Sequence, residues 1–424
     1  MAGIRVNGLL ALGWVAPVVL ALMWGLQFVA RASPGSAPPT PPSPLAAFDG
    51  DPPIADADAW LARRAPLLRQ AFLSRIYGEL PWTSEQRTDY RTIDNGSLHG
   101  AARLELVTLH VGLEQSPLHV ALFTPHGEQQ SSLVIVSDFC GLDIDIDPRL
   151  PRPLWRAPRC RSGVGRAITQ LSHGDAILRP SLQAMIDRGY AVAVFYAGEL
   201  APDDPVLFRQ TLHQHSANLH EIGAIGAWAS LYLAVFDALR QDPRVAPSQI
   251  ALWGHSRYGK AALLAAALDT RVGAVIANQS GTFGATLSSG TRGETPAQIS
   301  RRFPHWFPMA LQNGAAADGF DQHLLLALLA PRPVLLGNAG LDRWSDPAAS
   351  FAAARAASDA YALFGSEGLV QDTMRTPNLT ADIAFYVRPG GHGVRTSDWG
   401  RALDFLDIHF PKQGARARAP ARGA

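Results

Sequence analysis

Charged residues are scarce in this chain of 424 residues. They make up 17% of the sequence, and 37 lysines and arginines stand against 36 aspartates and glutamates. The chain therefore lacks the excess of basic charge with which proteins hold nucleic acid, and we expect no nucleic-acid partner. Hydrophobic residues make up 47%, a fraction that suits a globular protein with a sizeable core.

Cysteine is scarcer still, because the chain contains only Cys140 and Cys160. Two cysteines without a nearby group of histidines do not complete a tetrahedral shell, so no metal site is expected. A disulfide between them and two unrelated thiols are equally open from the sequence. The histidines His213, His215 and His220 have no acidic or sulfur partners in register, and we expect them at the surface or in packing. No motif indicates a cofactor, and none is expected.

The two ends of the chain differ in composition from the rest. An apolar run over residues 9–30 followed by small residues indicates that residues 1–32 form either a signal peptide or an N-terminal membrane anchor. Both interpretations place the body of the protein outside the cytosol, secreted, periplasmic or tethered to a membrane. Residues 33–53, rich in Pro, Ala and Ser, are expected to be a linker, residues 54–411 one domain, and residues 412–424 a disordered basic tail.

Short apolar segments alternate with helical patterns through most of the domain. This alternation predicts an α/β fold with a mostly parallel central sheet and helices on both faces, a three-layer αβα sandwich. Strands are expected at residues 133–136, 190–196, 249–254, 272–278, 333–337 and 383–388, and helices at residues 222–239 and 257–268.

Five other segments depart from this alternation. Residues 56–81 have the apolar periodicity of a lead-in helix, and residues 104–111 and 118–123 are typical of an antiparallel pair at the edge of the sheet. Residues 138–180 and 280–330 are long and irregular. Because such loops in compact α/β proteins cover the carboxyl ends of the strands, we expect them to border a ligand site.

The segment Ile250-Ala-Leu-Trp-Gly254-His-Ser256-Arg-Tyr-Gly259-Lys260 is the most informative part of the chain. It predicts a buried strand that turns sharply at Ser256 and continues into a helix rich in Ala and Leu. Such a turn presents a serine nucleophile, and the first N–H groups of the helix face any negative charge that forms beside it. The spacing departs from the common G-x-S-x-G, because Tyr258 occupies the second glycine position and the glycine follows at 259.

A serine nucleophile needs a histidine base and an acid that orients it, which follow the serine in the order acid, histidine in α/β-hydrolases. Among 13 histidines, His392 fits best because it follows a strand and the flexible turn Pro389-Gly-Gly391. Asp342 lies shortly after the strand at 333–337 and is our choice for the acid. Asp346 competes with it, but its position before a proline and an Ala-rich helix indicates an N-cap.

Two cations, Arg257 and Lys260, lie on the helix after the turn. Lys260 is one helical turn beyond Ser256, so we expect its side chain near the opening of the same site. Cations beside a nucleophile suit a substrate rich in hydroxyls, or an oxyanion that needs more than backbone donors. An ordinary solvated or salt-bridged side chain remains the alternative for each of them.

The motif Gly254-His-Ser-Arg-Tyr-Gly-Lys260 resembles the signature of the glucuronoyl esterases, α/β-hydrolases that cleave the ester between 4-O-methylglucuronic acid of xylan and lignin alcohols. The similarity is to the bacterial branch and covers about residues 65–410. The other segments that carry it, in chain order, are Gly223-Ala-Ile-Gly-Ala-Trp228, Asp242-Pro-Arg-Val245, Asn278-x-Ser280-Gly281, Arg292-Gly-Glu294, Phe303-Pro-His-Trp-Phe307, Asp321-Gln-His323, Ala330-Pro-Arg-Pro333, Asp342-x-Trp344-x-Asp346-Pro347 and Arg388-Pro-Gly-Gly-His392.

The resemblance implies the roles of the catalytic residues. Ser256 would be the nucleophile, His392 the base and Asp342 the acid. Arg257 would stabilise the oxyanion through its backbone N–H and its guanidinium.

The resemblance also implies a sugar site. Lys260 and Glu294 would bond to hydroxyls of the sugar, and Trp344 would pack on its ring. Without the family pattern, Glu294 is better interpreted as a solvated loop carboxylate and Trp344 as a core aromatic residue.

Three departures from the family limit what the resemblance implies. Many bacterial members carry an acidic residue where this chain has Gln279, so the histidine here depends on Asp342. The segment Ser137-Asp-Phe-Cys-Gly141 lacks the Asn- and His-containing pattern of the family, which leaves the second oxyanion donor open. The insertion at residues 143–166 has an unusual mix of Asp, Pro and Arg, so the substrate preference can differ.

From these observations we expect a monomeric serine carboxylester hydrolase that cleaves uronic-acid esters, 4-O-methyl-glucuronoyl esters in particular, and acts on a uronic-acid-containing polysaccharide or its ester. One alternative keeps the fold and the chemistry but takes another acyl group, such as acetyl. A second alternative is a carbohydrate-binding relative without activity, against which a complete set of Ser, His and Asp argues.

Overall fold

The computed structural model describes residues 40–82, 87–112, 116–127, 130–212, 221–289, 291–308 and 319–410. The expected signal peptide or anchor at residues 1–32, the expected tail at 412–424 and the histidines at 213, 215 and 220 lie outside these ranges. Within them, no helix combines the length and the apolar character that crossing a membrane requires.

A nine-stranded sheet runs through the described part of the chain in the order β1-β2-β3-β5-β4-β6-β7-β8-β9. Strands β4 to β9 pair in parallel, while β1, β2 and β3 are antiparallel to their neighbours. The strands are β1 Arg87–Gly96, β2 Ala102–Val111, β3 Ser116–Pro125, β4 Ser131–Ser137, β5 Ala191–Phe195, β6 Val245–His255, β7 Ala274–Asn278, β8 Val334–Ala339 and β9 Ile383–Arg388.

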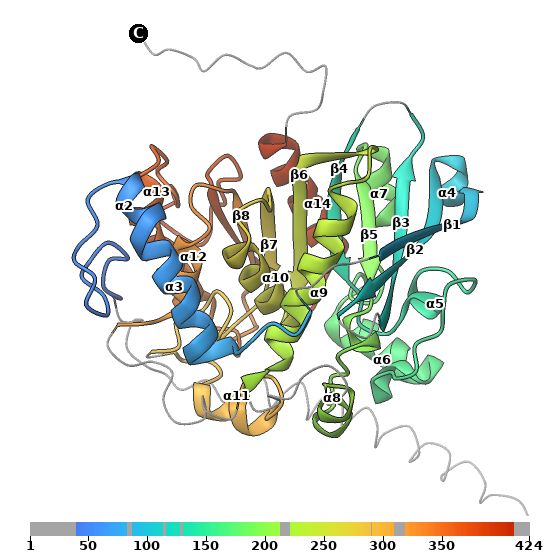
Figure 1. Ribbon diagram of the computed structural model, residues 1–424, viewed down its shortest axis with the longest axis horizontal. Coiled ribbons are helices and arrows are strands. Elements are labelled where there is room, and N and C mark those ends of the chain that lie inside the picture. Colours follow the sequence, from blue (N-terminus) through green and yellow to red (C-terminus); the bar gives the residue numbers. More distant parts are fainter. Residues whose placement is uncertain are drawn as a thin grey trace, which may run out of the picture.

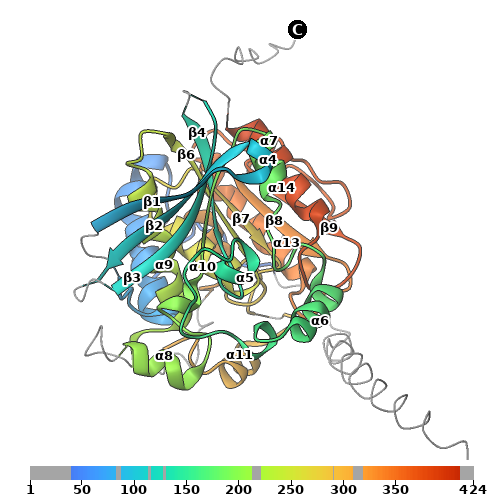
Figure 2. The same ribbon diagram turned by 90° about the vertical axis from the view of Figure 1, so that its right-hand side faces the viewer.

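Helices cover both faces of this sheet, as the two ribbon views show (Figures 1 and 2). Helices α3, α9 and α10 lie on one face and α7 and α14 on the other, which confirms the predicted three-layer α/β architecture. The helices are α2 Ala57–Ala59, α3 Ala65–Phe72, α4 Ser97–Gly100, α5 Leu142–Asp145, α6 Gly163–His173, α7 Leu182–Asp187, α8 Pro205–Leu212, α9 Ala224–Leu239, α10 Arg257–Leu268, α11 Pro296–Arg302, α12 Gln322–Ala327, α13 Pro347–Ala362 and α14 Thr396–His409, with π-helical turns at Trp60–Arg64 and Leu73–Tyr77 and short 3₁₀ turns at Pro158–Cys160 and Ala197–Glu199.

The parallel strands are apolar because both of their faces are covered. All five residues of β5 and of β7 are buried, and α9 is buried along most of its length. The ring of Trp253 on β6 stacks on that of Trp399 on α14 with 4.1 Å between centroids. Burial on both sides explains why these strands were recognisable as continuous apolar runs.

The edge of the sheet differs from the prediction. The predicted antiparallel pair is present as β2 and β3, but β1 adds a further strand outside it. Strand β1 has the sequence RTDYRTIDNG and lacks an apolar alternation, because it pairs on one side only and its side chains are largely solvated. A polar sequence of this kind is a common protection for an edge strand.

The described part of the predicted linker, residues 40–53, is not a free tether. Arg64, which is 1% exposed, donates hydrogen bonds to the carbonyl oxygens of Pro44 (2.6 Å), Ala46 (2.8 Å) and Pro52 (3.1 Å). Its Nε lies 2.9 Å from the carboxylate of Asp51. The composition of the segment suggested a linker, but a buried guanidinium that needs acceptors holds it against the domain.

A disulfide joins Cys140 to Cys160, with the two Cα atoms 5.3 Å apart. This decides between the two possibilities that the sequence left open. The bond ties the loop after β4 to the short 3₁₀ turn Pro158–Cys160, just before α6. It therefore fixes the insertion against the carboxyl end of β4.

Candidate active site

Ser256 stands between the end of β6 and the start of α10, at the turn that the sequence predicts. Its backbone has φ +56°, a left-handed conformation that is strained for a residue with a Cβ atom. The turn is tight: a Cβ atom on Gly254 would lie 2.1 Å from the carbonyl oxygen of Tyr258. Gly259 also approaches its neighbours closely, since its Cβ would lie 3.1 Å from the Gly254 oxygen and from Ser280. The two glycines therefore allow strand and helix to cross, and the serine is held at their junction.

A cavity of about 450 Å³ opens in front of Ser256. Two long loop regions and α6 contribute to its walls, as the irregular segments at residues 138–180 and 280–330 predicted. The expected site residues that line it are Ser256, Arg257, Lys260, Glu294, Trp344 and His392. The remaining one, Asp342, lies behind His392. All seven are thus brought to one place.

Asp342 and His392 form a direct pair. Nδ1 of His392 lies 2.7 Å from Oδ2 of Asp342, whose side chain is 1% exposed. Burial alone would raise the pKa of Asp342, but the charge and hydrogen bond of His392, with further hydrogen bonds from Ser345, hold it below its usual 3.8. The acid therefore stays ionised and fixes the tautomer in which Nε2 of His392 can accept a proton.

Gln279 follows β7 and supports the loop of His392 without supplying an acid. Its Oε1 accepts a hydrogen bond from the backbone N–H of Gly393 at 2.7 Å, and the carbonyl of Gly393 accepts one from Arg388 at 2.7 Å. These bonds position the loop that carries His392. Asp346, the competitor for the acid, caps α13 by accepting from the N–H of Ala349 at 3.1 Å, as predicted.

Two further histidines lie beside His392. The ring of His255 is 4.7 Å from that of His392 and the ring of His173 is 6.4 Å from it, centroid to centroid. Burial lowers the pKa of His255 well below 6.5, and burial with the charges of His392 and Arg159 lowers that of His173 to about 4. Both rings are neutral near pH 7, so they add no positive charge next to His392.

Arg257 is the first residue of α10, and its guanidinium is held from the side by Asp203 in an ion pair. Asp203 also binds Nε2 of His305 at 3.0 Å and Nε1 of Trp306 at 2.8 Å. The guanidinium carbon of Arg257 lies 5.1 Å from the centre of the Trp306 ring. The cation is thus fixed next to the serine by three side chains that sequence reasoning did not assign.

For His305 and Trp306, though not for Asp203, the sequence contained a signal. The segment Phe303-Pro-His-Trp-Phe307 was among those that resemble the family, but its side chains had no assigned role. Asp203 lies in a short irregular stretch between β5 and α8, where no periodicity or motif distinguishes it. Only the fold brings it to Arg257.

Lys260 and Glu294 are both buried, at 3% and 5% exposure. Nζ of Lys260 donates hydrogen bonds to the carbonyls of Ser280 and Thr282, the latter at 2.5 Å. Oε1 of Glu294 has no hydrogen-bond partner among the described residues. Burial lowers the pKa of Lys260 to about 8, and burial raises that of Glu294, each opposed by the other's charge. A buried carboxylate oxygen without a partner at a cavity wall is suited to a ligand hydroxyl.

Trp344 is tied to the same wall. Its carbonyl accepts from the N–H of Glu294 at 2.9 Å, and its side chain hydrogen-bonds to the Glu294 carboxylate. The guanidinium of Arg302 lies 5.9 Å from the centre of its ring. Trp344 is therefore a wall residue of the cavity and not the core aromatic residue of the alternative interpretation.

The sequence of the loop after β4 did not identify a second oxyanion donor. In the structure, two N–H groups of this loop bond to Asp138, which does not line the cavity. The N–H groups of Cys140 and Gly141 donate to the carboxylate of Asp138 at 3.0 and 2.5 Å. The part of this loop that lines the cavity is Phe139, whose ring lies 4.9 Å from that of Tyr258. This packing also accounts for Tyr258 in the second glycine position of the motif.

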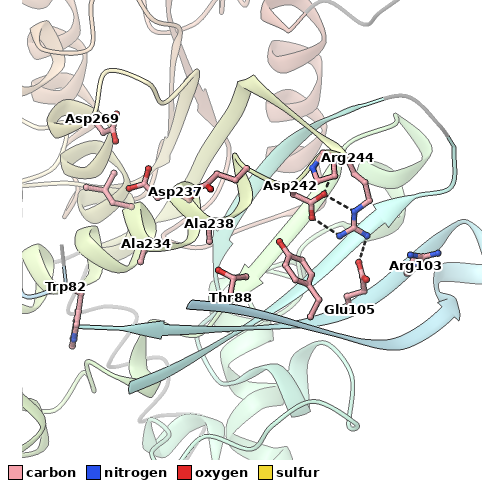
Figure 3. Close-up of a pocket in the computed structure, with 14 residues that line it drawn as sticks. Trp82, Thr88, Arg103, Glu105, Ala234, Asp237, Ala238, Asp242, Arg244 and Asp269 are labelled. Atoms are coloured by element: carbon pink, nitrogen blue, oxygen red, sulfur yellow. Dashed lines mark hydrogen bonds and ion pairs between the residues drawn. The ribbon is translucent and has the colours of Figure 1, made fainter. Parts of the chain in front are cut away.

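A second and larger cavity of about 880 Å³ lies elsewhere, between β1, β2 and α9 (Figure 3). Several of its charged groups are in ion pairs: Arg244 bonds to Glu105 and, at 2.7 Å, to Asp242, while Asp237 lies 2.7 Å from Arg271, which is outside the lining. Its described lining residues include neither serine nor histidine. The smaller cavity is therefore the candidate active site.

The chain was compared with proteins of known family and structure. The sequence model of the protein family described as "Glucuronyl esterase, fungi" matches residues 176–365 of this chain. Carbohydrate esterase MZ0003, from an unknown prokaryotic organism, is 31% identical over 392 residues, which cover 88% of this chain and 90% of that protein. The 4-O-methyl-glucuronoyl methylesterase 1 of Sodiomyces alcalophilus is 31% identical over 168 residues, or 36% of this chain and 34% of that protein.

Solved structures of esterases are also similar to this chain. A glucuronoyl esterase from Solibacter usitatus superposes with a TM-score of 0.76 and 26% identity, over 88% of this chain and 99% of that one. A promiscuous CE15 esterase from a marine bacterial metagenome also gives 0.76, with 27% identity over 88% of this chain and 98% of that one. Both similarities cover most of this chain and nearly all of the other. The chain belongs to the glucuronoyl esterase family of carboxylic ester hydrolases, with the α/β-hydrolase fold.

Proposed function

We propose that this protein hydrolyses esters of uronic acids, 4-O-methyl-glucuronoyl esters between xylan and lignin alcohols in particular, through an acyl-enzyme on Ser256. The observation that carries the proposal is one cavity that combines Ser256, the pair of His392 and Asp342, and the buried pair of Lys260 and Glu294. The first three supply ester hydrolysis. The last two give this site its sugar chemistry.

In the proposed reaction, Oγ of Ser256 attacks the ester carbonyl carbon while its proton passes to Nε2 of His392. Asp342 keeps its hydrogen bond to Nδ1 and stabilises the imidazolium that forms. The tetrahedral intermediate collapses when His392 gives its proton to the alcohol oxygen, and the alcohol leaves. Water then attacks the acyl-enzyme with His392 again as base, which releases the uronic acid and restores Ser256.

Arg257 supports the tetrahedral intermediate. As the first residue of α10 it carries a backbone N–H without an acceptor in the helix, beside the serine. Its guanidinium, held by Asp203 and lying over the Trp306 ring, lines the same cavity as Ser256 and would stabilise the negative charge that develops there. Two N–H groups of the loop after β4 already bond to Asp138, so we assign the greater part of oxyanion stabilisation to Arg257.

Lys260, Glu294 and Trp344 form the sugar wall. The free Oε1 of Glu294 accepts a sugar hydroxyl, Lys260 donates to another, and the Trp344 indole packs on the ring. A pocket built for hydroxyls rejects an acyl group without them, because its buried polar groups would stay unpaired. An acetyl ester would therefore be a poor substrate.

Turnover of benzyl glucuronate and of 4-nitrophenyl acetate by the purified protein tests this proposal. The glucuronate should have the higher kcat/KM, and Glu294→Gln should reduce kcat/KM for it at least about tenfold more than for the acetate. Glu367→Gln removes an exposed carboxylate and should change neither. No turnover of the glucuronate together with good turnover of the acetate would favour the alternative acyl group.

We also propose that the protein works outside the cytosol, as a monomer. The disulfide between Cys140 and Cys160 supports export, because such bonds persist in oxidising compartments. The intact mass of protein recovered from the expression host's exported fraction reports both cleavage at the N-terminal segment and the oxidation state of the cysteines. Light scattering on a sizing column reports the oligomeric state, and a dimer mass would contradict the monomer.

A further inference from the structure

Arg159 is a cation of the active-site cavity that neither the reaction nor the sugar wall uses. It lines the cavity from the 3₁₀ turn Pro158–Cys160. Within the described ranges, no carboxylate acts on its guanidinium, and the titratable groups nearest to it are the hydroxyls of Tyr258 and Tyr196. Its side chain is partly buried, which lowers its pKa from the usual 12.5, and an anionic ligand would offset the desolvation of this charge.

Among the described lining residues, the balance of charge leaves Arg159 without a counter-ion. The lining residues that the structure describes include four cations, Arg159, Arg257, Lys260 and Arg302, and two carboxylates, Asp203 and Glu294. Asp203 pairs with Arg257, and Glu294 faces Lys260. Arg302 lies over the rings of Phe303 and Trp344 on the sugar wall. Arg159 is thus the cation on the remaining wall, where no described carboxylate of the lining faces it.

That wall is built from the insertion and α6, and it is separate from the sugar wall. Its lining residues are Phe139, Ala157, Pro158, Arg159, Thr169, His173, Ile177 and Leu178. Helix α11 follows the sugar-wall residue Glu294. In Figure 1, α6 and α11 lie on different sides of the carboxyl end of β6. Most of these lining side chains are apolar, so the wall suits an aromatic or aliphatic group with one charged substituent.

The same wall lies next to the loop of His392, which gives its proton to the leaving alcohol in the proposed reaction. The N–H of Val394 donates to the carbonyl of His173 at 2.7 Å, and the N–H of Ala176 donates to the carbonyl of Val394 at 3.1 Å. These bonds join the end of α6 to the loop of His392. Since the alcohol oxygen takes its proton from His392, the alcohol must lie along this wall while the sugar occupies the other.

The position of Arg159 is fixed by covalent and ionic contacts. The next residue, Cys160, is bound to Cys140. In the same insertion Arg166 lies 2.7 Å from Asp145, and Arg156 pairs with Asp143. A cation on such a rigid loop loses little entropy when it binds an anion, which favours selectivity.

We propose that Arg159 is a specificity-determining residue that selects esters whose alcohol carries a carboxylate or another acidic group beyond an apolar body. The inference rests on the proposed function, because it takes the alcohol side of the ester as defined by His392 and the sugar wall. Neutral alcohols remain substrates, but acidic ones bind more tightly.

Three esters with the same acid part test this. They are benzyl glucuronate, 4-carboxybenzyl glucuronate and 4-carbamoylbenzyl glucuronate, the last a neutral match in size for the second. The native enzyme should have a kcat/KM about tenfold higher for the carboxybenzyl than for the carbamoylbenzyl ester, the size of one charge-assisted hydrogen bond at a partly exposed site. The preference should appear in KM and shrink at high salt.

Arg159→Gln should remove the preference and leave turnover of the two neutral esters within about twofold, while Arg159→Lys should keep part of it. Arg161→Gln is the matched control, since Arg161 is an exposed residue of the same loop whose side chain, among the described residues, donates only to the carbonyl of Arg156 at 3.1 Å. An equal loss of kcat on all three esters in Arg159→Gln would make Arg159 part of the oxyanion site and overturn the inference.

The two possible failures are distinguishable. Hydrolysis of all three glucuronates without a preference for the carboxylate contradicts the role of Arg159 and leaves the proposed function intact. No hydrolysis of any glucuronate contradicts the proposed function, and the inference fails with it because no alcohol side is then defined.

Discussion

The carboxylate of Asp342 lies 2.7 Å from Nδ1 of His392, and no second acidic side chain in the described ranges pairs with this imidazole. Gln279, the uncharged residue that follows β7, accepts a hydrogen bond from the backbone of Gly393. The orientation and the charge of the proposed base therefore depend on one carboxylate.

Asp342→Asn should lower kcat for benzyl glucuronate by about 10³- to 10⁴-fold, because the amide favours the wrong tautomer of His392 and cannot stabilise the imidazolium. Steady-state kinetics near pH 7.5 measures the loss, and a thermal melt shows whether the variant is folded. Asp404→Asn removes an aspartate whose side chain is 54% exposed and should keep full activity. A folded Asp342→Asn variant with more than a tenth of native kcat would contradict the assignment of the acid.

The protonation of Lys260 gives a pH dependence. Burial lowers its pKa to about 8, so it loses its proton in the folded protein while an unfolded chain keeps it up to about 10.5. Between these values the unfolded state binds more protons, and the contribution of this group to stability rises with pH. Binding changes in the opposite direction, because neutral Lys260 is a weaker donor to sugar hydroxyls.

The KM for benzyl glucuronate should therefore rise as the pH passes about 8. In Lys260→Met, KM should be high already at pH 7 and should not change between pH 7 and 9. Initial rates over a range of substrate concentrations at each pH give both values. A native KM that stays constant to pH 9.5 would show that Lys260 does not act through its charge.

The tight crossing of β6 and α10 predicts a strong contrast between two glycine substitutions. Gly254→Ala should give little soluble protein, because its Cβ would lie 2.1 Å from the backbone oxygen of Tyr258, which cannot move without displacing α10. Gly400→Ala lies in α14, where the new Cβ would meet no atom within 4 Å beyond the backbone of its own helix, and it should raise stability by about 0.5–1 kcal/mol. Soluble yield and denaturant unfolding measure the two. An active Gly254→Ala variant of native stability would contradict the described geometry of the turn.

The disulfide closes a loop with a sequence separation of 20 residues. Replacing both Cys140 and Cys160 by Ser should lower the free energy of unfolding by about 3 kcal/mol, mainly by freeing the unfolded chain. Denaturant unfolding with and without reductant measures this. Reductant should destabilise the native protein and leave the double variant unchanged, and equal stability of all samples would show that the bond contributes nothing.

The sequence predicted the parts of this structure that are set by local pattern. Helix α10 begins at Arg257 and ends at Leu268 as expected, because an Ala- and Leu-rich helix follows a turn with a clear motif. The parallel strands were recognisable since burial on both faces requires continuous apolar runs. His392 and Asp342 were found from chain order and strand ends, and the fold brings them into contact.

The parts that the sequence did not predict depend on contacts between distant segments. Strand β1 was missed because an edge strand needs no apolar alternation. The attachment of residues 40–53 was missed because it depends on the burial of Arg64. Asp203 and Arg159 come from irregular loops, where spacing carries no information about which cavity a side chain reaches.

Labelling with a fluorophosphonate, followed by mass analysis of the intact protein and its peptides, tests the central claim most directly. The native enzyme should gain one label, on the peptide that contains Ser256, and excess benzyl glucuronate should slow the labelling. Ser256→Ala should take no label and should lose at least about 10⁴-fold in kcat. A label on another residue, or continued turnover of the glucuronate by Ser256→Ala, would contradict the account.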